Sequence, residues 1–482
     1  MNAIHDYLEV NARRIPEKTA IIYKDEKLSY KELNDQCNQC AHALAVLGVV
    51  KGDRVVISTK NKLLEVIFCF GILKVGAVEV AIDAYDFVIA EDAIAQKTNA
   101  RLIVTDKPIG GRINVITPSR ELFFAFDKIP LSVPITPDDI AFIQHTSGST
   151  GLPMGIALSH RNFLIPLELN EYIVRRGQDI LFFQMPLAYA YGKSILLEYI
   201  AAGATIHLVD KIILPQESFN FFKLNSISAT EGPPSFYEML LRFSNFKKEP
   251  LENLTYISIG GGAATERLVK ELRNAQPQAT ISNRYGMTET ASVVTRVEFG
   301  QNSNPSKFGT CGIEAPYVKV KIVDDSGVEV SRGGSGELIV SGENISLGYI
   351  TEGMGLKQIT QDGWLNTGDI GRMDEDGYFY ILSRKSQIIK SQGYRISPAL
   401  IEEVLLRISG VESVVVVGVA HEIYGEIVKA FIVKNKGPLT ESEVISFCST
   451  RLSSFMLPRA IQFIDEMPLT FSGKIDKKRL PA

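Results

Sequence analysis

The sequence predicts an α/β fold: a large N-terminal domain of mixed or parallel sheets with helices and a β-rich subdomain, then a small, mobile α+β C-terminal domain. Three observations support this. Helical segments alternate with short apolar runs in the first part, β-prone runs separated by Gly and Asp follow at about 305–385, and a compact mixed unit ends the chain. A length of 482 residues fits, because single cores stop growing at roughly 250–300 residues.

The alternating pattern begins at Lys27 and reaches about Ile135, with apolar runs RVVIST, AVEVAI and RLIVT. It resumes after a Gly-rich stretch at 145–155, with strands predicted at DILFFQM, ATIHLVD and LTYISIG and helices at PSFYEMLLRF and TERLVKELRN. This order is typical of parallel strands joined by crossover helices. The Gly-rich stretch is therefore predicted to be a loop inside a domain.

The pattern of apolar runs and turn residues changes twice in the second half of the sequence. The runs VKVKIVDD, GELIVSG and GYFYILS predict an antiparallel subdomain at about 305–385. After Ile396, a helix at PALIEEVLLRI, strands at VESVVVVGVA and EIVKAFIVK, a second helix and the strand AIQFIDE predict a separate unit of about 95 residues. The predicted boundary near Ser386 gives a core of 1–385 and a C-terminal domain of 386–482.

Composition excludes several function classes. The 51 Lys and Arg against 55 Asp and Glu leave a net charge of -4, which provides no general attraction for nucleic acid. No apolar run approaches the roughly 18 residues of a membrane span, and the N-terminus lacks a secretory signal. Five cysteines are too few for a disulfide framework, so a cytoplasmic protein is expected. Cys37 and Cys40 form a C-x-x-C, but they lie in a predicted amphipathic helix and not in a zinc site.

The segment His145 to Gly155, HTSGSTGLPMG, predicts a phosphate-binding loop. Its glycines let the backbone approach a polyphosphate closely, and its hydroxyls and amides supply donors to the phosphate oxygens. It is not a Walker A loop, and the G-K-S at Gly192 to Ser194 is an accidental match because Leu187 stands where the first Gly is required. The predicted nucleotide ligands of the loop are Thr146, Ser147, Gly148, Ser149, Thr150 and Gly151.

TSGSTGLPMG resembles the phosphate loop of the superfamily of acyl-CoA synthetases, nonribosomal-peptide adenylation domains and luciferases, and stand-alone acyl- or aryl-CoA and acyl-carrier-protein ligases resemble this chain most. Further signatures of that superfamily follow in its order along nearly the whole chain. They are GGGA at 260–263, RYGMTE at 284–289, WLNTGD at 364–369, the segment 384–396, and the segment 468–480. Five motifs in order are far more specific than any one alone.

The resemblance implies a nucleotide site. Tyr285 would offer an aromatic face to adenine, Thr288 a hydroxyl to phosphate, and Glu289 an oxygen ligand to Mg²⁺. Asp369 would bind both ribose hydroxyls, joined by Arg384. The remaining residues of this predicted site are Gly261, Gly262, Ala263, Arg284, Gly286 and Met287.

The catalytic residues implied are Lys474, Lys390, Thr288 and Glu289. A lysine placed at the α-phosphate stabilises the charge that develops there without changing its protonation. Such enzymes rotate the C-terminal domain after adenylation, which removes the first lysine and brings the face from Lys390 to Gly393 inward for thiol attack. Two positions depart from the usual pattern, Met154 in place of the loop lysine and Ser386 at the hinge. Met154 would weaken the handling of pyrophosphate.

The predicted acid-binding residues are Tyr189, Tyr191, Gly192, Glu231 and Gly260. Tyr191 and Gly192 stand where amino-acid-activating members place an F-D pair, so an α-amino acid would have its ammonium unpaired. Tyr189 either lines the acyl site or is core. Glu231, as a loop-edge glutamate, is expected to be solvated, unless it faces the acid and binds an amine or hydroxyl remote from the α-carbon.

The expected protein is an ATP-dependent carboxylic acid ligase that forms acyl-AMP and pyrophosphate with Mg²⁺. It then transfers the acyl group to the phosphopantetheine thiol of coenzyme A or of an acyl or peptidyl carrier protein. Two alternatives stay open: a degenerate, non-catalytic nucleotide-binding protein, and an adenylating enzyme with an amine acceptor. No nucleic acid partner and no membrane span are expected, and a homodimer is left open.

Overall fold

A computed structural model provides the structure of the chain. It describes residues 1–84, 91–107, 114–145, 155–169, 175–210, 214–262, 264–291, 293–351, 355–391, 394–396, 398–421, 425–435, 437–468 and 475–481. The described residues divide into two compact units, Met1–Val320 with Val340–Leu365, and Lys321–Ile339 with Asn366–Ala482. The following paragraphs treat each unit by itself.

The first unit contains a nine-stranded sheet whose central strands are parallel, as the alternating pattern predicted. Its strands in spatial order are β15 (Ile313–Glu314), β14 (Val293–Phe299), β13 (Thr280–Gly286), β12 (Tyr256–Ile259), β11 (Ala229–Gly232), β9 (Ile180–Phe183), β10 (Thr205–Leu208), β1 (Thr19–Tyr23) and β2 (Glu26–Ser29). Only the edges are antiparallel, where β14 pairs with β13 and β2 pairs with β1.

An eight-stranded sheet forms the second layer of this unit. Its strands in spatial order are β19 (Leu356–Lys357), β18 (Gly348–Ile350), β8 (Gly155–Ser159), β7 (Ile140–His145), β4 (Val78–Ala81), β3 (Arg54–Ser58), β5 (Leu102–Thr105) and β6 (Asn114–Ile116). The strands from β7 to β6 are parallel, whereas β8 and β7 form an antiparallel pair. The sheet is therefore mixed.

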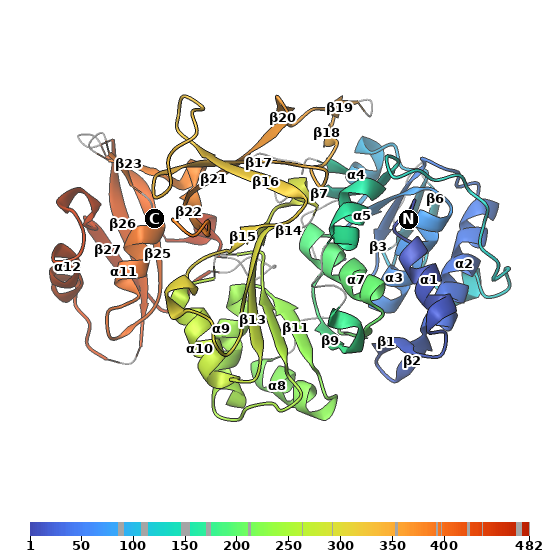
Figure 1. Cartoon of the computed structure of the whole chain (residues 1–482), viewed down its shortest axis with the longest axis horizontal. Helices are drawn as coiled ribbons and strands as arrows, with labels where there is room; N and C mark the ends of the chain where they lie inside the picture. The colour runs from blue at the N-terminus through green and yellow to red at the C-terminus, as the bar shows by residue number, and fades with distance from the viewer. Residues whose placement is uncertain are drawn as a thin grey trace. The chain divides into compact units, whose positions relative to one another are not determined.

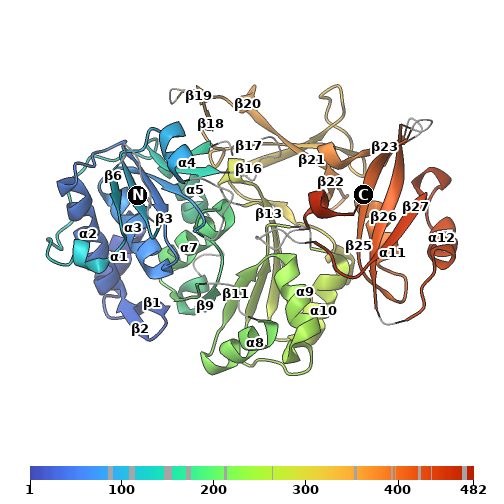
Figure 2. The same ribbon diagram turned by 180° about the vertical axis from the view of Figure 1, so that it is seen from behind.

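Helices cover these sheets. In the first unit they are α1 (Asp6–Arg14), α2 (Tyr30–Val46), α3 (Lys62–Lys74), α4 (Glu91–Lys97), α5 (His160–Leu169), α7 (Ala190–Ala202), α8 (Pro215–Leu224), α9 (Pro234–Phe243) and α10 (Glu266–Ala275). In Figure 1, α8, α9 and α10 gather against β11 and β13. In Figure 2, α2 and α3 lie together beside β3. One apolar core joins side chains from α2, α3 and α7 to strands of both sheets.

Helix α2 shows why these segments are helical. Ser29 and Glu32 form a capping box that satisfies free amides of the first turn. Cys37 and Cys40 are fully buried with free thiols, so the prediction of core positions for them is confirmed. None of the described helices combines the length and apolar character needed to cross a membrane.

A five-stranded sheet pairs the β-rich segments, and its strands β16, β17 and β21 each continue from one unit into the other. Its strands are β16 (Val318–Val323), β17 (Ser335–Gly342), β21 (Trp364–Met373), β20 (Thr360–Gln361) and β22 (Phe379–Arg384). The pairs β20–β21 and β21–β22 are antiparallel, as predicted for 305–385. The second compact unit groups 321–339 and 366–385 with the C-terminal residues. The boundary at 385/386 that we expect for domain motion stays a prediction.

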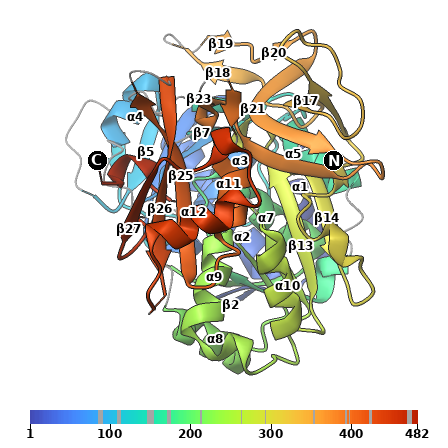
Figure 3. The same cartoon turned by 90° about the vertical axis from the view of Figure 1, so that its left-hand side faces the viewer.

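The end of the chain forms the expected α+β unit. Its sheet contains β24 (Tyr394–Ile396), β23 (Ile389–Ser391), β26 (Gly425–Lys434), β25 (Val411–His421) and β27 (Ala460–Ile464), with helices α11 (Pro398–Leu405) and α12 (Glu441–Ser449). Figure 3 shows α11 and α12 beside these strands. A separate apolar core includes residues of both helices and of β25 and β26. The fold class predicted from the sequence is confirmed.

Candidate active site

The predicted phosphate loop connects two paired strands inside the core of the first unit. His145 ends β7 and Gly155 begins β8, and the two residues are register partners. Burial lowers the pKa of His145 to about 4, so its imidazole is neutral at pH 7. The loop residues Thr146, Ser147, Gly148, Ser149, Thr150 and Gly151 lie outside the described residues, as does Met154. The strands fix both ends of the loop, and its phosphate contacts stay predictions.

Three parallel strands of the nine-stranded sheet end next to glycine. The glycines are Gly232 at the end of β11, Gly260 directly after β12, and Gly286 at the end of β13. Ligands of open α/β sheets bind outside the carboxyl ends of strands, and glycine permits their close approach. Gly261 has a φ of 72°, in the left-handed region that favours glycine. Ala263 lies outside the described residues, whereas Gly261 and Gly262 are exposed at this edge.

The segment from Tyr285 to Glu289 continues from this edge. Tyr285 packs against an apolar cluster that contains Val294 and Leu365, and Gly286, Met287 and Thr288 follow at the surface or half-buried. Glu289 lies in the single turn Thr288–Thr290.

The Glu289 carboxylate is held in place. It accepts a hydrogen bond of 2.9 Å from the Tyr349 hydroxyl, and its backbone carbonyl accepts one of 2.8 Å from the Ser346 amide. Burial and this carboxylate raise the pKa of Tyr349, so the hydroxyl stays a donor. Among the described residues no group of three or more His, Cys, Asp or Glu could hold a metal. A role for Glu289 as a ligand of Mg²⁺ stays a prediction.

The start of α7 faces the end of β12. Tyr189 is the half-buried N-cap residue of α7. The Tyr191 ring lies against Gly260, where a Cβ would come within 2.7 Å of the ring carbon Cζ. At Gly192 a Cβ would come within 2.2 Å of the Pro186 carbonyl oxygen, so close helix packing explains glycine there. Contact of these residues with an acid stays a prediction.

A buried polar network lies between α7 and the strand ends. The Arg284 guanidinium donates to both oxygens of Glu198, at 2.5 and 3.1 Å, and lies 3.4 Å from Glu231 Oε2. Glu231 also lies 3.3 Å from the Tyr191 hydroxyl and 3.5 Å from that of Tyr199. Arg284, predicted to bind nucleotide, thus directs its side chain into this network.

The expectation that Glu231 is solvated is wrong. Glu231 belongs to strand β11 and is only 1% exposed. The short, polar sequence ATEG does not resemble a buried strand, and the buried charge is offset in part by Arg284, 53 residues further along. Burial raises the pKa of Glu231, and Arg284 opposes this rise. Sequence reasoning missed Glu198, Tyr199 and Tyr349, although a glutamate within the apolar helix α7 indicates a buried partner.

The second unit brings Asp369 and Arg384 together. They are register partners on β21 and β22, and Arg384 Nε lies 2.8 Å from Asp369 Oδ1. Asp369 is buried while Arg384 is exposed, and an Arg384 terminal nitrogen also donates to the Thr367 carbonyl oxygen.

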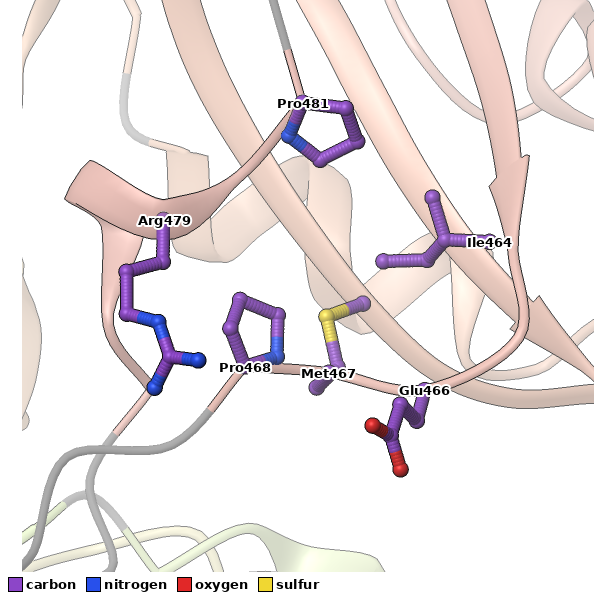
Figure 4. Close-up of a pocket in the computed structure, with 6 residues that line it drawn as sticks. All are labelled: Ile464, Glu466, Met467, Pro468, Arg479 and Pro481. Atoms are coloured by element: carbon purple, nitrogen blue, oxygen red, sulfur yellow. The ribbon is translucent and has the colours of Figure 1, made fainter.

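The two predicted lysines are only partly located. Lys390 is in β23, with its side chain outside the described part, and Lys474 lies in 469–474, which the structure does not describe. At its base the described residue Asp476 donates its amide to the Pro468 carbonyl oxygen at 2.8 Å. An open pocket adjoins this base, with Arg479 and Pro481 across from Met467 and Pro468 in Figure 4.

The Gly192-Lys193-Ser194 sequence is not a phosphate loop. It lies inside α7, and the fully buried Lys193 Nζ donates to both oxygens of Glu79 at 2.9 and 2.6 Å. The interpretation of this match as accidental is confirmed. Lys193 instead connects α7 to β4 through a buried ion pair.

The first unit therefore contains strands that end at glycine, the fixed carboxylate of Glu289 and the aromatic ring of Tyr285. The second unit contains the ion pair of Asp369 and Arg384. The AMP-binding enzyme family matches residues 8–350, and the AMP-binding enzyme C-terminal domain matches residues 400–474. The chain belongs to the AMP-binding enzyme family. The chemistry of this AMP-binding enzyme is that of an AMP-forming acid–thiol ligase, which consumes ATP with Mg²⁺, forms an acyl-AMP and then a thioester.

Known proteins resemble this AMP-binding enzyme over nearly its full length. A long-chain-fatty-acid–CoA ligase of Bacillus subtilis is 30% identical, covering 99% of this chain and 94% of its own. ATP-bound MatB from Rhodopseudomonas palustris is 25% identical with a TM-score of 0.88, covering 99% and 98%. O-succinylbenzoate coenzyme A synthetase from Bacillus subtilis, in complex with ATP and magnesium ion, is 25% identical with a TM-score of 0.84, covering 98% of each chain. The recognition made from the motifs is confirmed.

Proposed function

We propose that this enzyme activates a small-molecule carboxylic acid with Mg·ATP and transfers its acyl group to coenzyme A. The observation that carries the proposal is the fixed Glu289 carboxylate, four residues after Tyr285, beside the carboxyl ends of the parallel strands. Relatives named as CoA ligases over nearly the whole chain support coenzyme A as the acceptor. A phosphopantetheine-carrying protein would present the same thiol and is the alternative acceptor.

The nucleotide would be held by residues from several elements. The loop at 146–151 would bind the phosphates through its amides and hydroxyls. The Tyr285 ring would stack on adenine beside Gly261 and Gly262. The Asp369 carboxylate would accept from ribose hydroxyls, with Arg384 fixing the carboxylate in place.

The acyl transfer would follow domain rotation. Lys474 would stabilise charge at the α-phosphate during adenylation, and the Lys390 face would replace it when the C-terminal domain, 386–482, rotates. Ser386 lies in the single 3₁₀ turn Lys385–Gln387, and a hinge there would need only a few residues that change their backbone angles. The five free cysteines fit the reducing cytoplasm proposed as the location.

A product assay tests this function. The enzyme is incubated with Mg·ATP, a panel of carboxylic acids and, in turn, coenzyme A, a carrier protein and a simple amine, and products are identified by mass spectrometry. The proposal predicts AMP, pyrophosphate and an acyl-CoA thioester. Products restricted to an acyl-carrier protein or an amide would refute coenzyme A as the acceptor, and release of ADP would refute adenylation.

Mg²⁺ would supply charge neutralisation of the phosphates, and Glu289 would be its protein ligand. Tyr349→Phe removes the hydrogen bond that orients this carboxylate, and orienting partners are commonly worth 10- to 100-fold in metal affinity. We expect the Mg²⁺ concentration for half-maximal adenylation to rise roughly tenfold. The measurement is a Mg²⁺ titration at saturating ATP.

Tyr380→Phe is the matched control, because the Tyr380 hydroxyl also donates to a carboxylate, Asp374 Oδ2, at 3.2 Å on the β-rich sheet. It should leave the Mg²⁺ titration unchanged. Equal effects of the two substitutions would argue against Glu289 as the metal ligand.

A further inference from the structure

Glu231 lies at the carboxyl end of β11, beside the proposed nucleotide edge. It precedes Gly232 at the carboxyl end of β11, and Gly232 is the register partner of Ile259, which directly precedes Gly260. Arg284, which contacts Glu231, is one residue before Tyr285 on β13. Successive strand residues face opposite sides of a sheet, so the Arg284 side chain leads away from the face of Tyr285. The network therefore lies beneath the proposed nucleotide edge, on the side of α7.

The contacts of Glu231 are weak for a buried carboxylate. Its distances of 3.3, 3.4 and 3.5 Å to Tyr191, Arg284 and Tyr199 are long for charge-assisted hydrogen bonds, which are about 2.7–2.9 Å. The Ser258 hydroxyl also lies beside this carboxylate and lowers its pKa. Arg284 instead forms a close bidentate ion pair with Glu198. A buried carboxylate is costly unless donors satisfy it fully. Glu231 thus retains capacity to accept a strong hydrogen bond.

The charges around Glu231 point to the same conclusion. The carboxylates of Glu198, Glu231 and Glu298 face the guanidiniums of Arg284 and Arg296. The neighbouring pair of Arg176 and Asp179 adds one charge of each sign. Lys18 adds a further cation beside Asp179, so the enlarged cluster is balanced in charge. Close to Glu231, however, the carboxylates of Glu198 and Glu231 share the guanidinium of Arg284, which favours a strong hydrogen-bond donor from the ligand.

Tyr191 separates this network from the exposed edge. Its ring is half-buried against Gly260, its hydroxyl points to Glu231, and the Arg284 guanidinium lies 5.6 Å from the ring centroid. A ligand group reaching Glu231 from the edge would pass the Tyr191 ring and could replace its hydroxyl. Tyr191 and Glu231 together form a polar end to any acid site here, unlike the apolar lining that is usual for small-molecule pockets.

From these contacts we propose that the acid activated by this enzyme carries an amino or hydroxyl group remote from its carboxyl group, and that Glu231 accepts a hydrogen bond from that group. The inference rests on the proposed function, because it assumes that an acid is activated at this edge. Arg284 acts as a positioning residue, since it holds Glu198 and orients the Glu231 carboxylate. A purely alkyl acid would leave the Glu231 carboxylate incompletely satisfied and is disfavoured.

Matched acids test the proposal. Each set consists of three acids that differ in one group, which is amino, hydroxyl or methyl. The group is placed on the meta carbon of benzoate, on the para carbon of benzoate, or at the end of a hexanoate chain. Acid-dependent exchange of labelled pyrophosphate into ATP gives kcat/KM for each acid. In at least one set we expect the amino or hydroxyl acid to exceed the methyl acid by about tenfold or more. Comparing the amino with the hydroxyl acid tells which donor is bound.

Glu231→Gln should reduce that preference about tenfold, because the charged acceptor is lost. Glu238→Gln is the matched control: this half-buried glutamate on α9 pairs with Arg267, and its substitution should leave the preference intact. Tyr191→Phe removes a donor from Glu231 without altering a buried charge, so it should preserve or increase the preference. Melting temperature and ATP binding confirm that each variant is folded.

The outcomes separate the two proposals. A wild-type preference for the methyl acid in every set, or an unchanged preference in folded Glu231→Gln, would overturn this inference while leaving acid activation established. A loss of preference in Tyr191→Phe equal to that in Glu231→Gln would also overturn it. Absence of exchange with every acid would instead contradict the proposed function, and this inference with it.

Discussion

Lys474→Ala is expected to slow acyl-AMP formation on the order of 100-fold or more, because removing one group that stabilises transition-state charge commonly costs that much. The enzyme should still bind ATP, since the predicted phosphate loop, Tyr285 and Asp369 remain in place. The measurement is single-turnover formation of acyl-AMP by rapid quench, with ATP affinity determined separately by calorimetry.

Lys478→Ala provides the control, because it removes the same charge four residues further along. It should change the adenylation rate by less than about threefold. Thioester formation from preformed acyl-AMP should also survive in Lys474→Ala, since Lys474 is predicted to leave the site before that step. An unchanged single-turnover rate in Lys474→Ala would remove the catalytic role from this lysine.

Lys193→Met is expected to destabilise the first unit by about 3–5 kcal/mol, because it leaves Glu79 as an uncompensated buried charge. Both side chains are fully buried, and their pairing joins α7 to β4. Burial alone would lower the pKa of Lys193, but Cys69 and Glu79 beside it outweigh that effect and raise the pKa, so the lysine is charged at pH 7. Chemical denaturation followed by circular dichroism measures the loss, and hydrogen exchange in α7 assigns it to this unit.

Two variants sharpen this prediction. Lys223→Met breaks an exposed ion pair with Glu249 and should cost no more than about 1 kcal/mol. The double substitution of Lys193→Met with Glu79→Leu replaces the buried pair by apolar groups and should recover most of the stability. A loss in Lys193→Met no greater than that in Lys223→Met would show that the buried pair contributes little.

Much of the fold could be predicted because the relevant signals are local. The helix predicted at PSFYEMLLRF corresponds to α9, Pro234–Phe243, and the apolar run RLIVT contains β5. The phosphate-loop segment was predicted to interrupt an α/β core, and β7 and β8 on either side bear this out. Apolar periodicity and glycine content are readable in a short window.

The buried ion pairs could not be predicted, because they depend on residues far apart in sequence. Lys193 and Glu79 are separated by 114 residues, and Glu231 and Arg284 by 53. A charged residue in a short segment favours an exposed loop on composition alone. Only the folded chain shows that an arginine lies beside the Glu231 carboxylate, so the sequence alone favours a solvated glutamate there.

The central claim is that this chain forms an acyl-adenylate from ATP and a carboxylic acid. Acid-dependent exchange of labelled pyrophosphate into ATP tests it most directly, because exchange requires reversible formation of the adenylate. The account predicts exchange that depends on both an acid and Mg²⁺, and that is lost in Lys474→Ala. No exchange from the folded, ATP-binding enzyme across a broad panel of acids would contradict it and favour a nucleotide-binding protein without catalysis.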